Sequence, residues 1–137
     1  MAADLPRQPI LIELSPGELL DRVAVLEITR ERTPDAAKRD LVVRELTTLS
    51  RLGDEGIAWT EELRDLFRAL KAIHATLWDL ENNLRGYEEA GDLGERFINE
   101  ANALRAGKDR RTALQGQINE RCASSPVMAK SQLMEVS

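Results

Sequence analysis

A run of charged residues in the last third of the chain has the composition of an anion-binding site. Lys108, Asp109, Arg110 and Arg111 follow one another directly. The planar guanidinium group of arginine donates two parallel hydrogen bonds to phosphate or carboxylate. Two alternatives stay open: these cations bind an anionic ligand or a partner, or the helix breaks at Gly107 and they face water.

Lys108 and Arg111 fall on the apolar stripe that we expect for this segment. Charges on a buried stripe are costly unless an opposite charge or a ligand compensates them. We expect that compensation from acids of the preceding segment, such as Asp79 or Glu81, or from an anionic ligand.

A second polar group lies between residues 74 and 85. His74 is the only histidine and Cys122 the only cysteine, which argues against a zinc site. A histidine beside an apolar seam is more often packed or hydrogen-bonded than catalytic, and no nucleophile-elbow motif accompanies it. The other members of the group are Asp79, Glu81, Asn82, Asn83 and Arg85.

A pattern of carboxylates offers an enzymatic alternative. Glu61, Glu62 and Asp65, followed by Glu89 and Asp92, loosely resemble the paired acidic motifs of all-helical nucleoside-triphosphate pyrophosphatases. A magnesium site needs several oxygen atoms that converge on one point. An expected helix end separates Glu89 from Asp92, so these two acids should not share a helical face. A Mg²⁺-dependent pyrophosphatase is therefore the third choice.

The longest predicted helix runs from Thr60 to Ala90. Its apolar residues recur at alternating steps of three and four, as in a helix that packs along one seam. Thr60 is a candidate N-cap and Gly91 a natural helix end. The seam also favours a homo-oligomer. Its members are Leu63, Leu66, Leu70, Ile73, Leu77, Leu80, Leu84 and Tyr87.

Three further helices are expected. Ser15, Pro16 and Glu18 form a capping-box start for a helix that ends near residue 32. A second helix begins at the Thr-Pro pair at 33 and 34, and Gly53 ends it. The fourth runs from 93 to about 123 with Asp92 as its cap, and its glycines at 107 and 116 favour a kink or a break.

We therefore predict an all-α domain of four main helices in two antiparallel hairpins, preceded by a short extended segment at Ile10–Leu14. That segment is too short and solitary for a sheet, unless it pairs with the same run of another subunit. The predicted division is a flexible arm over 1–9, a single helical domain over 10–126 and a C-terminal tail over 127–137. The tail either docks on a groove or is disordered.

Composition is typical of one soluble globular domain: 137 residues, 42% hydrophobic, 31% charged and only 4% aromatic. The sequence contains no apolar run of about 18 residues, so it predicts no membrane span. The N-terminus lacks signal-peptide features, and a single cysteine makes no internal disulfide, so we expect a cytoplasmic protein. The net charge of −5 argues against broad nucleic-acid binding.

Charge is unevenly distributed along the chain. Residues 54–95 hold eleven acids and four bases, a net charge of −7, whereas residues 96–121 hold six bases and three acids, a net charge of +3. Either the acidic and the basic helix pair with each other, or the basic segment forms a local anion site.

Several stretches of the chain resemble the motifs of one known family. Residues 12–22 (IELSPGELLDR) with LEI at 26–28 resemble an opening SPGELIDKLTILEIK. LWDLE at 77–81 with Leu84-Arg85 resembles a LWDIED-IR segment, DRR at 109–111 resembles NDRR, and Ile118-Asn119 resembles IN. By these motifs the chain is similar to the DUF6165 family of small bacterial and phage domains. The similarity extends from Ile12 to about Ser131, where the family closes with EEKSY.

The resemblance implies a helical domain that occurs alone or beside glycosyltransferase or repeat modules, without a settled activity. It also implies a shared binding site at the polar motifs. Lys108 replaces the family's Asn before Asp109, and the segment 128–133 lacks the two acids and the Tyr of the closing motif. If these positions form a pocket, the pocket of this chain is altered.

The leading functional hypothesis is a non-enzymatic binding module, with no cofactor, metal or catalytic residue. It would hold a small anionic ligand, such as a nucleotide, cyclic nucleotide or nucleotide-sugar, and in a phage genome it would act as a sponge for a nucleotide immune signal. The alternative is an oligomerising helical adaptor without a small ligand. The candidate ligand-binding residues are Asp21, Arg22, Asp79, Arg85, Asp109, Arg110, Arg111 and Asn119.

Overall fold

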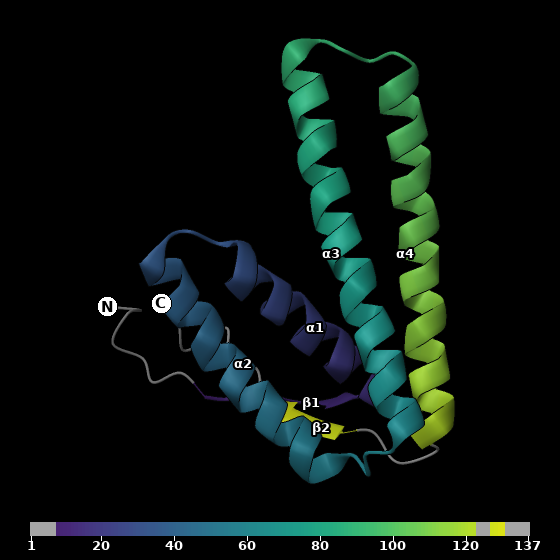
Figure 1. Ribbon diagram of the computed structural model, residues 1–137. Coiled ribbons are helices and arrows are strands. Elements are labelled where there is room, and N and C mark those ends of the chain that lie inside the picture. Colours follow the sequence, from purple (N-terminus) through teal and green to yellow (C-terminus); the bar gives the residue numbers. More distant parts are fainter. Residues whose placement is uncertain (1–7, 123–126, 131–137) are drawn as a thin grey trace.

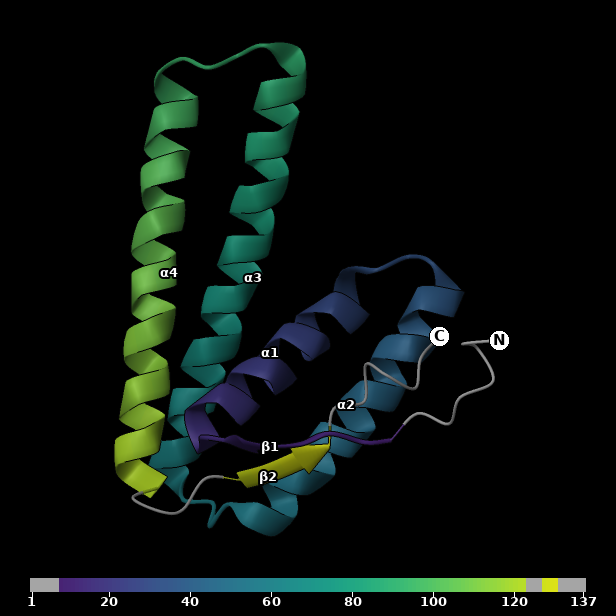
Figure 2. The same ribbon diagram turned by 180° about the vertical axis from the view of Figure 1, so that it is seen from behind.

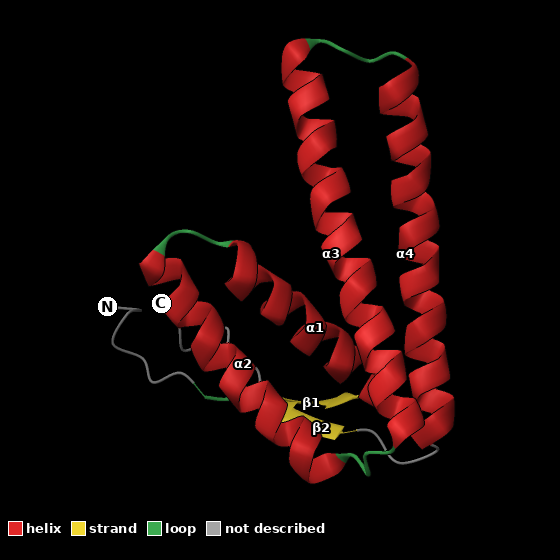
Figure 3. Ribbon diagram, in the orientation of Figure 1, coloured by secondary structure: helices red, strands yellow, loops and turns green. Residues whose placement is uncertain are grey.

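The computed structural model describes residues 8–122 and 127–130. Its four helices are α1 (Pro16–Arg32), α2 (Ala36–Gly56), α3 (Glu61–Ala90) and α4 (Glu95–Cys122). α1 with α2, and α3 with α4, form two antiparallel hairpins (Figures 1 and 3). The predicted all-α fold of two hairpins is therefore confirmed.

α1 is the middle layer of the molecule. α2 packs on one side of it and the α3–α4 hairpin on the other, and α1 contacts all three of these helices. Its buried side chains include Leu19, Leu20, Val23 and Leu26. Figures 1 and 2 show that α3 and α4 extend far beyond α1, so only the lower part of their hairpin is covered by a third helix.

Three predicted helix ends are observed. The Ser15 hydroxyl accepts the backbone N–H of Glu18 at 3.1 Å and caps α1. Thr60 caps α3 in the same way, because its hydroxyl accepts the N–H of Leu63 at 3.1 Å. Gly91 follows α3 with a φ of 70°, a left-handed conformation that glycine adopts without steric cost.

Other predicted bounds were wrong. Asp35, not Thr33, caps α2, and its carboxylate accepts the N–H of Ala37 at 2.9 Å. α2 continues past Gly53 to Gly56, because Gly53 is buried below the side chains of α1 rather than ending the helix.

The fourth helix also differs from the prediction. It begins at Glu95 and runs unbroken to Cys122 through Gly107 and Gly116. Gly107 lies directly below the side chain of Leu77, so a Cβ there would come within 2.7 Å of Leu77 Cδ2. The glycine thus permits close packing of α3 and α4 rather than breaking α4.

A short two-stranded sheet lies beside the lower ends of the helices. β1 (Leu11–Leu14) pairs antiparallel with β2 (Val127–Lys130), with Leu11 opposite Lys130 and Leu14 opposite Val127. The prediction that the first run is too solitary for a sheet was wrong, because its partner comes from the far end of the chain. The predicted arm (1–9) lies mostly outside the described residues, as do 123–126 and 131–137, which include Ser131.

Candidate functional site

Three helices meet at a polar cluster, which we call the joint. It consists of Asp21 on α1, His74 on α3, and Arg111 and Gln115 on α4. His74 Nε2 lies 2.7 Å from Asp21 Oδ1, and Arg111 Nε lies 3.8 Å from the same oxygen. His74 is buried, with 7% of its surface exposed. The joint therefore ties α1 to both helices of the other hairpin.

The electrostatics of the joint favour a charged Asp21. Burial raises the pKa of its carboxyl group. Hydrogen bonds from His74 and Gln115, with the electrostatic effect of His74 and of the Arg111 guanidinium, outweigh that effect, so the pKa of Asp21 lies below its usual value of 3.8. The carboxylate thus acts as the anion that compensates Arg111. Sequence reasoning expected an acid of α3, Asp79 or Glu81, or an anionic ligand in that role. The acid beside Arg111 is Asp21 of α1, whereas Asp79 pairs with Arg32.

Asn119 has a structural contact next to the joint. Its Oδ1 accepts the backbone N–H of Gly17 at 2.7 Å, which satisfies a free N–H in the first turn of α1. A Cβ on Gly17 would lie 2.4 Å from the carbonyl oxygen of Gln115, so only glycine fits here. α1 and α4 are in close backbone contact at this point.

The other candidate residues are dispersed. Arg22 pairs with Glu45 of α2 at 2.7 Å and so links the first hairpin. Asp79 pairs with Arg32 at the end of α1. Arg85 hydrogen-bonds with Asn82, one turn away on α3. These three residues face different neighbours and do not converge with the joint.

The basic group on α4 is largely open to solvent. Arg105, Lys108, Asp109 and Arg110 are exposed, and within the described part of the chain none of them makes an ion pair. Arg111 Nε is buried and has no hydrogen-bond partner, since 3.8 Å is too long for one. Of the eight candidates, the structure brings together Asp21, Arg111 and Asn119.

The acidic and basic segments do not neutralise each other. Among the described residues a single ion pair joins α3 to α4, between Arg121 and Glu62 at 2.6 Å. The remaining contacts of opposite charges on these helices run to α1 or stay within one helix. The pairing alternative drawn from charge distribution therefore accounts for little of the charge.

The carboxylate motifs lie far apart. Glu62 is in the first turn of α3 and Glu89 in its last, and a rise of about 1.5 Å per residue separates them by roughly 40 Å. They cannot share one Mg²⁺ within a chain. Among the described residues no group of three or more His, Cys, Asp or Glu side chains is arranged to hold a metal ion.

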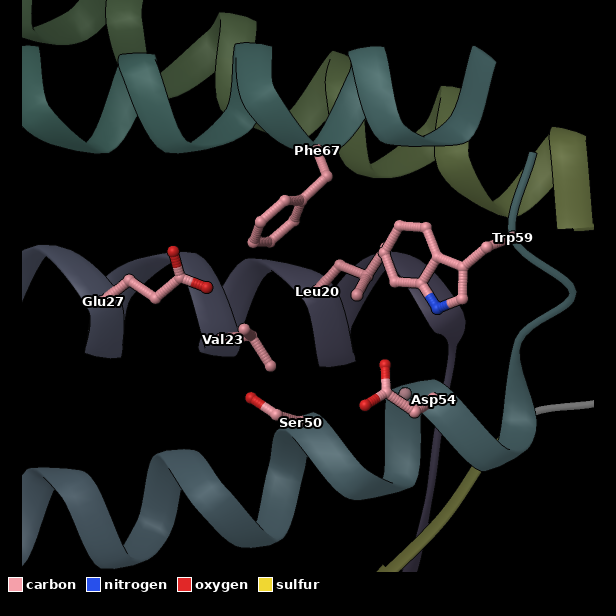
Figure 4. Close-up of a pocket in the computed structure, with 8 residues that line it drawn as sticks. Leu20, Val23, Glu27, Ser50, Asp54, Trp59 and Phe67 are labelled. Carbon is pink, nitrogen blue, oxygen red and sulfur yellow. The ribbon is translucent and has the colours of Figure 1, made fainter. Parts of the chain in front are cut away.

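Sequence reasoning missed a pocket of about 170 Å³ between α1, α2 and the start of α3 (Figure 4). Its aromatic walls are Trp59 and Phe67, whose rings meet edge to face at 6.2 Å. The remaining lining residues are Leu20, Val23, Glu27, Ser50, Gly53 and Asp54. The two aromatic residues, eight positions apart in an aromatic-poor chain, were the available signal.

Comparison with protein-family models, with curated proteins and with solved structures finds no match to this chain. The similarity to DUF6165 therefore stays a prediction from sequence. No helix within the described residues combines the length and apolar character needed to span a bilayer.

Proposed function

We propose that this chain is a non-enzymatic interaction module that self-associates through the outer part of its α3–α4 hairpin. The outer hairpin is defined as residues 80–110. It begins beyond Asp79 on α3 and ends before Arg111 on α4, the two residues that pair with side chains of α1. The main support for this proposal is that the apolar repeat of α3 continues past the point where α1 stops covering it.

Exposed and half-buried apolar side chains support this proposal. Leu80, Phe97 and Leu104 are only half-buried, and Leu93 and Ile98 are 58% and 56% exposed. Two helices alone bury one stripe each, and most helical domains add a further layer. A second copy placed beside the first about a two-fold axis would complete a four-helix arrangement.

Charge supports the same arrangement. Within the described chain the bases Arg105, Lys108 and Arg110 lack acidic partners. α3 carries the acids Glu81, Glu88 and Glu89 on the same outer hairpin. An antiparallel second copy can place these acids opposite the bases, which favours a defined pairing of subunits.

Sedimentation equilibrium tests the proposal. Wild-type protein is expected to sediment as a dimer or larger species, and Ile98→Glu as a monomer, because a charge replaces an exposed apolar contact. The matched control is Leu41→Glu, an apolar residue on α2 that is 41% exposed and lies outside the outer hairpin. A monomeric wild type at the highest soluble concentration contradicts the proposal, as does equal weakening by both substitutions.

A second candidate function is binding of a small anionic ligand by the basic group of α4. The supporting observation is that Arg110 and Lys108 are exposed without ion pairs in the described chain, beside Arg111 with its unpartnered Nε. A ligand at about 100 times its Kd stabilises the native state by about 2.7 kcal/mol, which corresponds to several degrees in Tm.

A thermal-shift screen with nucleotides, cyclic nucleotides and nucleotide-sugars tests this candidate. Arg110→Ala is the informative variant, because Arg111→Ala would also disturb the joint. Arg64→Ala, an exposed base on the lower part of α3, is the control. A ligand-induced shift that Arg110→Ala removes and Arg64→Ala keeps supports the site, whereas a flat screen rejects it for these ligand classes.

A further inference from the structure

The pocket between α1, α2 and the start of α3 has the size of a site for one small group. Its volume of about 170 Å³ lies below the roughly 300–1,000 Å³ of pockets for drug-sized ligands. It is close to the ~150 Å³ cavity that accommodates one benzene molecule. A nucleotide does not fit, whereas a ligand of about six non-hydrogen atoms does.

The walls favour a ligand with an apolar body. Leu20 and Val23 of α1 form one wall, Phe67 of α3 lies above them, and the Trp59 ring lies beside Leu20 (Figure 4). An aliphatic chain that enters this space removes its own surface and that of the walls from water.

The charges at the pocket favour a cation. Glu27 and Asp54 line it, and no basic residue does. Glu27 lies 3.1 Å from Lys71 Nζ, but Lys71 also pairs with Glu31 at 2.6 Å, so these three residues together keep a negative charge. Asp54 makes no ion pair with any described residue.

The position of Asp54 adds to the negative potential. It lies in the last turn of α2, where the helix dipole is negative and cations, not anions, are stabilising. Glu55 follows it, and no basic residue occupies that turn. A bound cation would add a favourable interaction with this helix end.

The Trp59 indole supplies the last feature. Its Nε1 is buried and has no hydrogen-bond partner in the structure, an unfavourable state for an N–H group. In Figure 4 the nitrogen edge of the indole faces the part of the pocket that holds Asp54. A ligand that carries an oxygen acceptor would satisfy this N–H.

We propose that this pocket binds a small aliphatic ammonium ion that carries an oxygen acceptor, an amino alcohol in chemical class. The ammonium group pairs with Asp54, Glu27 adds negative potential at the other end of the pocket, the chain packs on Leu20 and Phe67, and the oxygen accepts from Trp59 Nε1. Neither the joint nor the outer hairpin contributes to this site.

Three isosteric probes test the proposal: 4-aminobutan-1-ol, pentylammonium, which lacks the oxygen, and butane-1,4-diol, which lacks the charge. The readout is Trp59 fluorescence in the full chain with Trp78→Phe, so that one indole reports. Saturable binding is expected to be tightest for 4-aminobutan-1-ol. The loss of the hydrogen bond should weaken pentylammonium roughly fivefold, and the loss of the charge should weaken the diol roughly tenfold or more.

Asp54→Asn is the decisive substitution. It should weaken 4-aminobutan-1-ol binding roughly tenfold. It should also leave the unliganded Tm unchanged or slightly raised, because it removes an acid from the negative end of α2. Glu55→Gln is the control, since this neighbour changes the same helix end without lining the pocket.

Three results would overturn the proposal: no saturable change with 4-aminobutan-1-ol, equal affinity for the charged and neutral probes, or equal weakening by Asp54→Asn and Glu55→Gln.

A blocked Ala-Lys-Ala peptide included as a fourth probe distinguishes a free amine from the side chain of a protein partner. Tighter binding of that peptide than of the amino alcohol would also reject a free ligand. Repeating the titration in Ile98→Glu separates this outcome from that of self-association.

Discussion

The inner and outer parts of the α3–α4 hairpin have the same apolar repeat but different surroundings. In the inner part, below residue 80 on α3 and beyond 110 on α4, Leu70, Leu114 and Ile118 are completely buried because α1 forms a third layer. In the outer hairpin Leu84 is buried, whereas Leu80 and Leu104 remain half-exposed. A heptad-like seam thus determines which helices pair, and a third helix determines where their contact becomes a core.

The polar residues differ in the same way. Polar side chains of the inner part include contacts between the two hairpins, such as that of Asp21 on α1 with His74 on α3 at 2.7 Å. In the outer hairpin the polar contacts between helices join only α3 and α4: Asn83 donates to Glu100 at 2.9 Å, and Arg96 lies 5.8 Å from the Tyr87 ring centre. The inner contacts hold the two hairpins together, whereas the outer ones only hold α3 on α4.

The largest expected effect is at the apolar core of the inner part. Leu70→Ala should lower the free energy of unfolding by about 3 kcal/mol, because it leaves a cavity in a completely buried site. Leu80→Ala in the outer hairpin should cost less than about 1.5 kcal/mol, since that side chain is half-exposed. Urea denaturation of both, in the Ile98→Glu background to avoid self-association, measures the difference. Equal losses would show that the two parts are equally covered.

A pair of glycines sharpens the comparison. Gly17→Ala should cost about 2 kcal/mol, because the new Cβ would lie 2.4 Å from the Gln115 carbonyl oxygen and force α1 away from α4. Gly86→Ala in the outer hairpin meets no atom within 4 Å and should stabilise by about 0.5–1 kcal/mol. Opposite shifts in Tm are expected, and a stabilising Gly17→Ala would refute the close contact.

The joint should make the free energy of unfolding depend on pH. Asp21→Asn is expected to lower the free energy of unfolding by about 1.5 kcal/mol at neutral pH, through the loss of its charge-assisted contacts with His74 and Arg111. Because the folded-state pKa of Asp21 is lowered, its contribution is complete above its usual value of 3.8 and is lost as pH falls through the folded value.

Urea titrations of wild type and Asp21→Asn across that range measure this dependence. Their difference in unfolding free energy should shrink at pH values below 3.8, as the carboxylate of folded Asp21 becomes protonated. Curves that stay parallel down to the lowest accessible pH would show that the joint does not stabilise the charged carboxylate.

The smallest effect is expected in the outer hairpin. Tyr87 donates to Glu100, and the hydrogen bond and negative charge of that carboxylate raise the pKa of the tyrosine. Both groups are accessible to water, which replaces the lost partner, so Tyr87→Phe should leave Tm close to that of wild type. A loss comparable with Asp21→Asn would mean that this contact is covered in the native assembly.

Much of the fold was predictable from short-range patterns. The seam of α3 and the caps at Ser15, Thr60 and Gly91 each depend on residues within a few positions of one another. Glycines were less predictable. Gly53 indicated a helix end and Gly107 a kink or a break, but both lie inside helices where a neighbouring side chain packs over them. A glycine needed for space cannot be told from one needed for a turn without knowledge of its neighbour.

The candidate site was less predictable than the fold. Asp21, Arg111 and Asn119 were predicted as ligand-binding residues, and the structure places all three in contacts between α1 and α4. Their role in ligand binding stays a prediction. The acid that compensates Arg111 was wrongly assigned, because residues 21 and 111 meet only through the crossing of α1 over α4. The pocket at Trp59 was not found for the same reason, since its walls come from three helices and a loop.

The amino-acid sequence by itself determined four amphipathic helices, their main caps and the pairing of consecutive helices, because backbone hydrogen bonds and apolar periodicity act over one or two turns. Tertiary structure alone decided that α1 is the middle layer, that β1 pairs with β2 and that Arg111 of α4 lies beside Asp21. These features depend on the crossing of helices and on contacts between residues far apart in the chain, which local patterns do not specify.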